Sequence, residues 1–318
     1  MELDELAAEH RFSGVVRIDR DGQRTERAYG FADRAHGIAN TPATRFGIAS
    51  GSKGFTAVVV LTLVADGVLR LDTRARELLG ADLPLIADDV TVEHLLSHRS
   101  GIGDYIDEDL PGSVNDHVMP VPVHRLDSTE AFLQVLDGFP TKFRAGERFS
   151  YCNGGFVVLA LLAERASGVP YADLVDQRVC QPAGMAATGF ERTDSLPGSV
   201  AIGYLDVDPG VLQSNALHLP VVASGDGGAC TTAADIAAFW YALDTGRLLD
   251  PALVEEMTRH RSEEYGLGLW LDPGGLRLTG SDAGASFQSW HEPGGATTTV
   301  LSNVSSGAWP IVRALGGA

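Results

Sequence analysis

Cysteine and lysine are scarce in this sequence of 318 residues. The three cysteines, Cys152, Cys180 and Cys230, form no Cys-x-x-Cys pair, and this odd, scattered set excludes a disulfide scaffold and a zinc ribbon. Of the 24 basic residues, only Lys53 and Lys142 are lysines. Arginine stays protonated in proteins whereas a buried lysine can release its proton, so any lysine base is one of these two residues.

Positive charge and long apolar runs are also lacking. Acidic residues number 42, which gives a net charge of -18 at pH 7 and predicts no nucleic-acid partner, because phosphates would repel the chain. The longest apolar run, residues 55–65, is about half of the roughly 20 residues that span a bilayer, so it predicts a buried helix and no membrane partner. Residues 1–5 are acidic where a secretion signal needs a basic start, so we expect a cytoplasmic protein.

What remains is the composition of an ordinary globular protein, with 44% hydrophobic and 21% charged residues. The first part of the chain predicts a short helix over 3–10 and a β-hairpin of 12–20 and 24–31 around the turn 21–23. An interior helix is expected over 50–66, closed by Gly67. The clearer helices that follow are expected over 92–97, 128–136, 154–167 and 171–177, with a long surface loop over 102–126.

The last part of the chain returns to strands. We expect helices over 232–243 and 309–315, and antiparallel strands over 265–271, 276–281, 286–291 and 297–303. This order predicts an α/β (α+β) fold, with an antiparallel sheet flanked by N- and C-terminal helices and an inserted all-helical domain. We assign 1–70 and 225–318 to the discontinuous α/β domain and 71–224 to the helical domain, with the active site in the cleft between them.

Ser50 and Lys53 open the apolar helix, and a spacing of three places the hydroxyl and the amine on one helix face. A helix N-terminus favours developing negative charge, and burial lowers the pKa of a lysine toward values useful for proton abstraction. The pair is either a nucleophile with its base, or a capping serine beside a lysine that extends to solvent. Lys53 follows Ile48 and precedes Phe55 and Val58, and because an unpaired ammonium is costly among apolar residues, this setting favours function.

Two other segments place polar residues where the apolar pattern breaks. Tyr151, Cys152 and Asn153 precede a strongly apolar helix, so Tyr151 and Asn153 can project together. Residues 280–285 enter a strand, where a glycine lets a substrate approach the backbone closely.

In this order, the three motifs resemble those of the serine β-lactamase and penicillin-binding-protein family, especially its class C β-lactamase, D-Ala-D-Ala carboxypeptidase and family VIII esterase branch. Residues 92–101, 227–235 and 265–268 extend the resemblance over nearly the whole chain. It implies a β-lactamase/transpeptidase-like fold. It also implies that Ser50 is the acylated nucleophile, that Lys53 accepts its proton and that Tyr151 is a second acid or base.

The resemblance also assigns the rest of the site. Asn153 would orient the substrate amide or Lys53, and the substrate would contact residues of the third motif. The oxyanion hole would consist of two backbone N–H groups. The assigned substrate-binding residues are Asn153, Ser281, Asp282 and Gly284, and the oxyanion donors are Ser50 and Ala285.

The third motif departs from the family. It usually reads Lys-Thr-Gly or His-x-Gly, but by spacing it reads Asp282-Ala283-Gly284 here. Because Asp282 would repel a carboxylate, neutral or cationic acyl substrates fit better than β-lactams or peptide C-termini. One interpretation is that Asp282 and the acidic residues of the long loop together recognise a substrate amine. The alternative for the loop residues is that they are solvated surface charges. The loop residues concerned are Asp104, Asp107, Glu108 and Asp109.

Other candidates for chemistry have simpler explanations. Cys152 has no adjacent base in the sequence, which favours packing over nucleophilic chemistry. His94 and His98 share a helix face but lack the glutamate of a zinc-protease motif, so we interpret them as structural. His291 ends a predicted strand near the third motif, where it either faces the cleft or packs.

Nucleotide-binding proteins with a phosphate loop and α/β-hydrolases are excluded because the sequence lacks the motif of each class. Residues 47–54 superficially look like a phosphate loop, but Ser52 precedes Lys53 and Gly54 follows it, which reverses the required order. The chain also has no Gly-x-Ser-x-Gly elbow of an α/β-hydrolase.

We therefore expect a serine hydrolase that forms an acyl-enzyme on Ser50 of a small ester, amide or peptide substrate. Esterase-like activity is expected first, because esters need the least leaving-group assistance. A D-amino-acid peptidase or amidase and then a β-lactamase are the alternatives on this fold, and a non-catalytic sensor or binding protein is the alternative of a different class. No metal or cofactor is expected, and the oligomeric state is left open.

Overall fold

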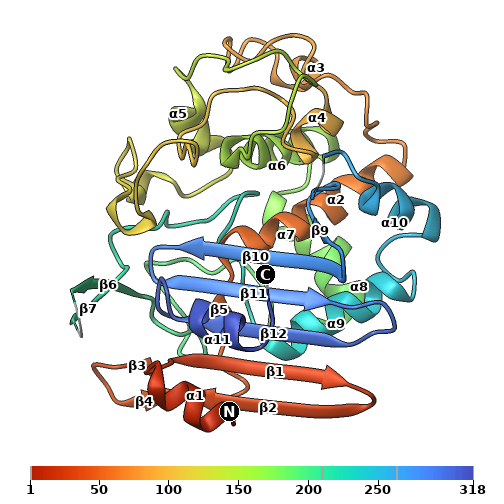
Figure 1. The fold of residues 1–318 in the computed structure, drawn as a ribbon. Coiled ribbons are helices and arrows are strands. Elements are labelled where there is room, and N and C mark those ends of the chain that lie inside the picture. The colour runs from red at the N-terminus through yellow and green to blue at the C-terminus, as the bar shows by residue number, and fades with distance from the viewer. Residues whose placement is uncertain (1, 209–210, 263, 318) are drawn as a thin grey trace.

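A six-stranded antiparallel sheet, in the order β2-β1-β12-β11-β10-β9, organises one half of the molecule (Figure 1). The computed structural model describes residues 2–208, 211–262 and 264–317. β1 pairs with β12, so the early hairpin and the late strands join in one sheet, which confirms the predicted fold class. The strands are β1 (Gly14–Arg20), β2 (Gln23–Tyr29), β9 (Trp270–Asp272), β10 (Gly275–Asp282), β11 (Ala285–His291) and β12 (Thr297–Ser302).

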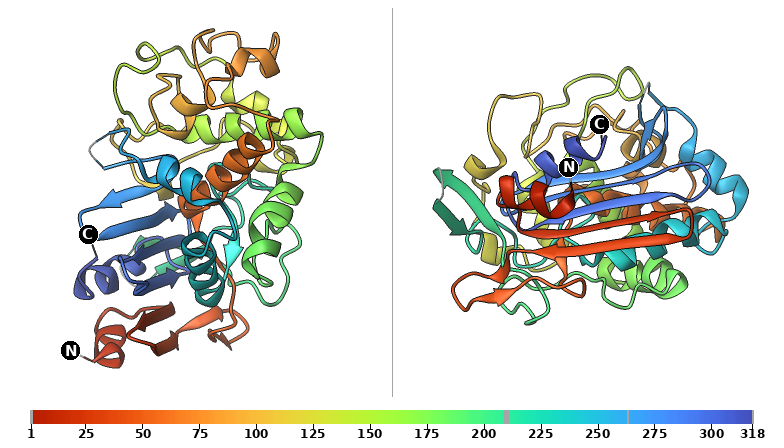
Figure 2. Two further views of the ribbon diagram at one scale, coloured as in Figure 1. Left: turned by 90° about the vertical axis from the view of Figure 1, so that its right-hand side faces the viewer. Right: turned by 60° about the horizontal axis from the view of Figure 1, so that its bottom comes forward.

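Helices cover both faces of this sheet (Figure 2). Successive side chains of a strand point to opposite faces, and accordingly Val15 joins the main core whereas Val16 joins a smaller cluster on the other face. The smaller cluster is formed with the terminal helices α1 (Leu3–Glu9) and α11 (Ala308–Ala314). Because both faces are covered, every residue of β12 is buried.

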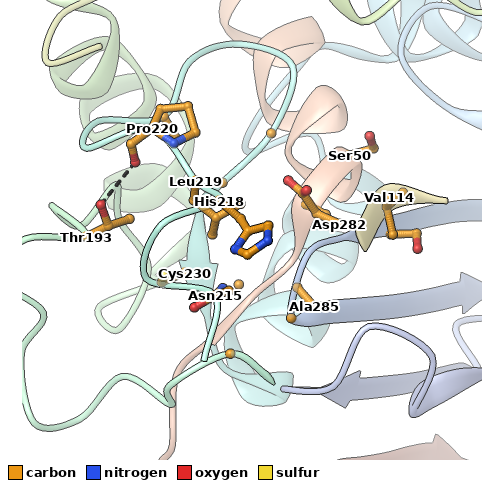
Figure 3. Close-up of a pocket in the computed structure, with 18 of the residues that line it drawn as sticks. Ser50, Val114, Thr193, Asn215, His218, Leu219, Pro220, Cys230, Asp282 and Ala285 are labelled. Carbon is orange, nitrogen blue, oxygen red and sulfur yellow. Dashed lines mark hydrogen bonds between the residues drawn. The ribbon is translucent and has the colours of Figure 1, made fainter. Parts of the chain in front are cut away.

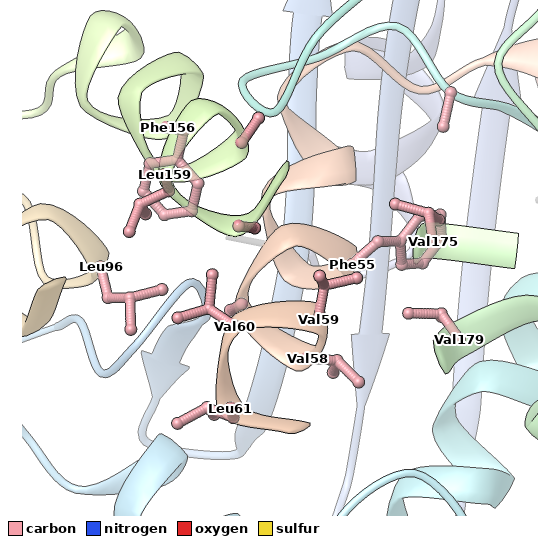
Figure 4. Close-up of a cluster of buried hydrophobic side chains, with 14 of the residues drawn as sticks. Phe55, Val58, Val59, Val60, Leu61, Leu96, Phe156, Leu159, Val175 and Val179 are labelled. Atoms are coloured by element: carbon pink, nitrogen blue, oxygen red, sulfur yellow. The ribbon is translucent and has the colours of Figure 1, made fainter. Parts of the chain in front are cut away.

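The main core is built around two buried helices, α2 (Lys53–Ala65) and α6 (Asn153–Ser167). Phe55 and Val60 of α2 lie in the same cluster as Phe156 and Leu159 of α6 (Figure 4). The predicted interior helix is therefore confirmed, although its first turn is a separate 3-10 helix, η1 (Ala49–Ser52). The two helices begin with the polar residues Lys53 and Asn153, which therefore lie at the edge of this core.

The other elements surround the core. The remaining α-helices are α3 (Ala75–Leu79), α4 (Val92–Leu96), α5 (Leu133–Leu136), α7 (Tyr171–Val175), α8 (Gln181–Ala183), α9 (Ala233–Asp244) and α10 (Pro251–Thr258). Short helical turns are η2 (Val114–Asp116), η3 (Val123–Arg125), η4 (Glu130–Phe132) and the π-helical η5 (Asp176–Cys180). Small two-stranded sheets pair β3 (Phe31–Asp33) with β4 (Ile38–Ala39), β5 (Phe46–Gly47) with β8 (Cys230–Thr231), and β6 (Tyr204–Asp208) with β7 (Val211–Ser214). None of the helices in the described ranges has the length and apolarity to span a membrane.

Some expected elements differ from the structure. The strand expected over 265–271 is only the short β9, because Gly266 and Gly268 instead press against neighbouring backbone and α2. A Cβ at Gly268 would lie 2.4 Å from the Cβ of Ala57. The helix expected over 128–136 is a 3-10 turn followed by the four-residue α5. α10 was not predicted from the sequence, although its start is marked by the capping Asp250 and by Pro251.

Residues 225–229 begin with a turn and form an irregular segment that packs against α2 and α6. Thr56 of α2 donates a hydrogen bond to the Gly225 carbonyl at 2.6 Å, and the Ala229 N–H donates to the Ser52 hydroxyl at 3.0 Å. A Cβ at Gly225 would lie 2.2 Å from the carbonyl oxygen of Phe156, so no side chain fits there without moving α6. This 225–229 segment is therefore fixed to both helices.

We predict that Gly225→Ala lowers the free energy of unfolding by about 1–3 kcal/mol, because the added methyl group overpacks the contact with α6. Urea unfolding of the wild type and the variant measures this difference. Gly112→Ala is the matched control, since a Cβ at Gly112 meets nothing within 4 Å. Equal destabilisation by the two substitutions would contradict the packing argument.

Candidate active site

Ser50 and Lys53 lie on one face of the turn that joins η1 to α2. The Lys53 amine donates a hydrogen bond to the Ser50 hydroxyl at 2.9 Å. Ala49, directly before Ser50, has a φ of 45°, which is unusual for a residue other than glycine. Ser50 is half-buried at the wall of a cavity, so a strained turn presents its hydroxyl to an incoming ligand.

Lys53 is almost completely buried, with 2% of its surface exposed. Its amine donates to three oxygens: Ser50 Oγ, Asn153 Oδ1 at 2.8 Å and the Asp226 backbone carbonyl at 2.6 Å. Burial lowers the pKa of Lys53, and the nearby carboxylates, of which Asp226 has the largest effect, oppose that shift. The net direction favours the neutral amine that a general base needs.

Tyr151 lies beside the same amine. The Lys53 Nζ lies 5.0 Å from the centroid of the Tyr151 ring, and the ring packs 4.2 Å from that of His98, centroid to centroid. Burial raises the pKa of Tyr151 well above its usual value, nearby carboxylates add to the effect, and a hydrogen bond with Ser50 opposes it. Burial therefore lowers the pKa of Lys53 and raises that of Tyr151, so Lys53 suits the role of base and Tyr151 that of proton donor.

Asn153 is positioned by the acidic loop segment. The Asp104 carboxylate accepts hydrogen bonds from the N–H groups of Asn153 at 2.5 Å and Gly154 at 2.9 Å, and thereby caps α6. The Asn153 side-chain amide donates to Glu108 at 3.0 Å and to the Ile106 carbonyl at 3.3 Å. With its oxygen on Lys53, the Asn153 amide orients the base, and both of its N–H groups already have acceptors.

The other acidic loop residues have structural partners. Lys142 donates to Asp107 at 2.6 Å and to Asp109 at 3.4 Å, and the Ser150 hydroxyl donates to Asp109 at 2.9 Å. Asp104 is likewise occupied by the cap of α6. Of the four loop carboxylates considered from the sequence, only Glu108 lines the cavity.

The strand β10 brings the third motif to Ser50, but through Gly280 and not through Gly284. A Cβ at Gly280 would lie 2.8 Å from the Ser50 nitrogen and 2.2 Å from the Ile48 carbonyl oxygen. Gly284 instead packs against Gly203, and its N–H donates to Ser305 Oγ at 2.8 Å. Of the two glycines of this motif, Gly280 therefore makes the close approach to Ser50, whereas Gly284 lies in the hairpin turn and lines the cavity with Ser281 and Asp282.

The pairing of β10 with β11 decides which N–H groups are available. Asp282 and Ala285 close a two-residue turn and form its hydrogen-bonded pair. The next pair, Ser281 with Ser286, is then of the non-hydrogen-bonded type, so the N–H of Ser281 points away from β11 toward the open strand edge that contacts η1. This arrangement differs from the expected oxyanion donor Ala285, whose N–H is used by the turn, and makes Ser281 the better-placed partner of the Ser50 N–H.

Ser50, Asn153 and the third-motif residues Ser281, Asp282 and Gly284 line one cavity of about 300 Å3, whereas Lys53 and Tyr151 are not among its lining residues (Figure 3). Its acidic lining residues are Glu108, Glu191, Asp226 and Asp282, and its walls include Met119, Phe132, Leu196 and Leu219. No arginine or lysine belongs to this lining among the described residues. Glu191 pairs with Arg45 at 2.5 Å outside the cavity, which leaves three carboxylates without an arginine or lysine ion pair in the described ranges.

Asp282 is a half-buried member of this set, and its carboxylate points into the cavity (Figure 3). Burial raises the pKa of Asp282 to about 6, and the charge of Asp226 adds to this effect. Burial also raises the pKa of Asp226, although Lys53 and a hydrogen bond from Tyr105 oppose the shift. Asp282, two residues beyond Gly280, therefore presents a carboxyl group to the cavity.

The remaining candidates have structural roles in the molecule. The Cys152 sulfur accepts a hydrogen bond from the Gly155 N–H, and burial raises the pKa of its thiol well above the usual value. His94 accepts from the Thr91 N–H, and His98 accepts from the Cys152 N–H at 3.0 Å while its other ring nitrogen contacts the Tyr265 hydroxyl. His291 does not line the cavity; it stacks on Trp240 and pairs with Asp244 at 2.9 Å.

Two residues of the site, Asp226 and Tyr105, were missed by the sequence analysis. Asp226 directly precedes residues 227–235, which were singled out only for their resemblance, and its backbone carbonyl accepts from Lys53 across 173 positions of sequence. No local pattern marks such a contact. The described residues contain no group of three or more His, Cys, Asp or Glu side chains placed to hold a metal ion.

Comparisons with known proteins show which family the chain belongs to. A family model described as Beta-lactamase matches residues 2–306. The D-aminopeptidase of Brucella anthropi is 31% identical over 297 residues, which are 87% of this chain and 53% of that protein, so the chain spans about half the length of that relative. The penicillin binding protein from Bacillus halodurans has a similar structure, with a TM-score of 0.91, 35% identity and 99% of each chain covered. A D-stereospecific amidohydrolase from Streptomyces sp. follows with a TM-score of 0.77, 26% identity, and 95% and 92% covered.

We predict that Asp282→Asn makes the fold more stable at pH 8. The folded-state pKa of about 6 lies above the usual aspartate value, so ionisation of Asp282 costs stability as the pH rises through that range. The gain from the substitution should be largest above pH 6 and should vanish near pH 4, where Asp282 is protonated in the folded wild type. Urea unfolding at both pH values, with the exposed Asp21→Asn as control, checks this; a variant no more stable than wild type at pH 8 would contradict it.

Proposed function

This chain is a serine hydrolase that belongs to the β-lactamase family, and we propose that it hydrolyses esters whose acyl part is neutral or carries an amine. The single observation that carries the substrate proposal is the set of three carboxylates, Glu108, Asp226 and Asp282, in a cavity that no arginine or lysine of the described residues lines. An anionic acyl group would be repelled there, and a cationic one attracted.

In the proposed acylation step, Ser50 Oγ attacks the substrate carbonyl carbon and its proton passes to the neutral Lys53 amine. The 2.9 Å contact between the two groups provides the path for this proton. The N–H groups of Ser50 and Ser281 then stabilise the oxyanion, a contribution of about 3–4 kcal/mol for a typical donor. Tyr151 gives a proton to the leaving group as the tetrahedral intermediate collapses, and Lys53 returns the proton to Tyr151.

In deacylation, a water molecule attacks the Ser50 ester. The water proton passes to the base, and the Ser50–acyl bond breaks to release the acid and restore the hydroxyl. Asn153 and the Asp226 carbonyl keep the Lys53 amine in place through both steps, because each accepts one of its N–H groups.

Ester hydrolysis comes first among the proposed activities, because esters need less leaving-group assistance than amides. Hydrolysis of amides of D-amino acids with a free amine is the second candidate. It is favoured by the carboxylates beside Ser50 and by similarity to proteins named D-aminopeptidase and D-stereospecific amidohydrolase. A β-lactam, whose carboxylate needs a cation, fits this cavity least well.

The acyl-enzyme is tested by intact-protein mass spectrometry after incubation with p-nitrophenyl acetate and, separately, with a penicillin. We expect an acetyl adduct with release of nitrophenol, lost in Ser50→Ala and retained in the control Ser128→Ala, which changes an exposed serine. Little penicilloyl adduct should form. A persistent penicilloyl adduct would overturn the substrate proposal, and no adduct from either reagent would favour a binding protein.

The role of negative charge is tested by comparing D-alanine p-nitroanilide, which has a free amine, with p-nitrophenyl acetate, which has none. Asp282→Asn should lower kcat/KM for the amine-bearing substrate by about tenfold or more, and should change that for the neutral ester by less than about twofold, since only the first loses an ionic contact. Equal losses on both substrates would show that Asp282 does not recognise an amine.

A further inference from the structure

The 225–229 segment supplies one of the three acceptors of the Lys53 amine. The peptide carbonyl of Asp226 receives the shortest of the three hydrogen bonds, at 2.6 Å. The same segment is tied to α2 at one end and to η1 at the other, because Thr56 donates to the Gly225 carbonyl and Ser52 accepts from the Ala229 N–H. The position of the Lys53 amine therefore depends on how this one peptide is held.

The side chain of Asp226 is held from the opposite direction. The Tyr105 hydroxyl donates a short hydrogen bond to the Asp226 carboxylate. Tyr105 belongs to the acidic loop, one residue after the Asp104 that caps α6, and both partners of the contact line the cavity. We call this contact the Tyr105–Asp226 bridge; it connects the loop that positions Asn153 to the segment that positions Lys53.

The bridge also fixes one of the charges around the buried amine. The titratable groups that act on Lys53 come from four parts of the chain, and the negative ones oppose the effect of burial. Among the carboxylates, Asp226 has the largest effect. The groups are Asp226 of the 225–229 segment, Asp104 and Glu108 of the acidic loop, His98, Tyr151 and Cys152 beside α6, and Asp282 of β10.

We propose that the Tyr105–Asp226 bridge is a positioning device for the Ser50–Lys53 pair: it fixes the peptide that receives the Lys53 amine, and it keeps one negative charge next to that amine. Asp226 is thus a positioning residue that acts through Lys53 on every substrate. This separates its role from that proposed for Asp282, which acts on substrates that carry an amine. The inference rests on the proposed function only for its consequence in catalysis.

The small number of lysines makes the bridge measurable without any substrate. In protein labelled with carbon-13 at the ε-carbon of lysine, only Lys53 and Lys142 give lysine signals, and Lys142→Arg assigns them. The midpoint of the Lys53 signal is followed as a function of pH in the wild type, Asp226→Asn and Tyr105→Phe. Asp21→Asn and Tyr241→Phe, which change an exposed aspartate and an exposed tyrosine, are the matched controls.

We expect Asp226→Asn to move the Lys53 midpoint to lower pH, because the ammonium form loses its main neighbouring negative charge. Tyr105→Phe should move it in the same direction by less, because the carboxylate stays but is no longer held. The acid limb of kcat/KM for p-nitrophenyl acetate should move with the midpoint, and kcat/KM at its optimum should fall by about tenfold in Tyr105→Phe.

The Lys142 signal reports on the fold in the same spectra, since Lys142 pairs with Asp107 and Asp109 away from the bridge. If this signal is unchanged and the Lys53 midpoint of both variants equals that of the wild type, the inference is wrong. A change in the midpoint with no hydrolysis by the wild type would support the bridge and overturn the proposed function instead. If Asp226→Asn fails to fold, Tyr105→Phe alone decides the outcome, because it removes only one hydroxyl group.

Discussion

The burial of one ammonium-forming side chain, Lys53, is the constraint on which this site depends. Two apolar helices, α2 and α6, meet at their N-terminal ends, and the lysine amine lies in that junction with 2% of the residue exposed. The ammonium form of Lys53 has an acceptor for each of its three N–H groups, drawn from three distant parts of the sequence. The neutral form keeps the acceptors Asn153 and Asp226 and turns its lone pair to the Ser50 hydroxyl. Satisfying that amine fixes where the helices, the acidic loop and the 225–229 segment can lie.

The same burial divides the chemical roles. Desolvation disfavours the charged form of any group, so it lowers the pKa of Lys53 and raises that of Tyr151. One group becomes a base and the other a proton donor in a single environment. The carboxylates oppose the pKa shift of Lys53 and reinforce that of Tyr151.

The sequence predicted the class of fold and the meeting of Ser50, Lys53, Tyr151 and Asn153, because local patterns mark each of them. Ser50 and Lys53 are three residues apart at a helix start, and Tyr151 and Asn153 precede a second apolar helix. What the sequence could not show depended on strand register. By spacing, the third motif was aligned on Gly284, but β10 reaches η1 two pairs before its turn. Gly280 is therefore the glycine beside Ser50, and Gly284 lines the cavity.

Long-range contacts were the other limit. The acidic loop was expected either to bind an amine or to be solvated, whereas Lys142 and the start of α6 are hydrogen-bond partners of all four of its carboxylates. Asp226 was missed because no periodic pattern predicts which residue of an irregular segment will contact a lysine far away in the sequence. The 3-10 turn that carries Ser50 was also missed, since a run of small residues is compatible with either helix type.

The central claim is that a neutral Lys53 activates Ser50 as a nucleophile, and labelling by a fluorophosphonate probe tests it most directly. The labelled peptide is identified by tandem mass spectrometry, and the labelling rate is measured as a function of pH. The account predicts that the adduct is on Ser50, that Ser50→Ala abolishes it, and that the rate rises with the fraction of neutral Lys53. An adduct on another residue, or no labelling of folded wild-type protein, would contradict the account.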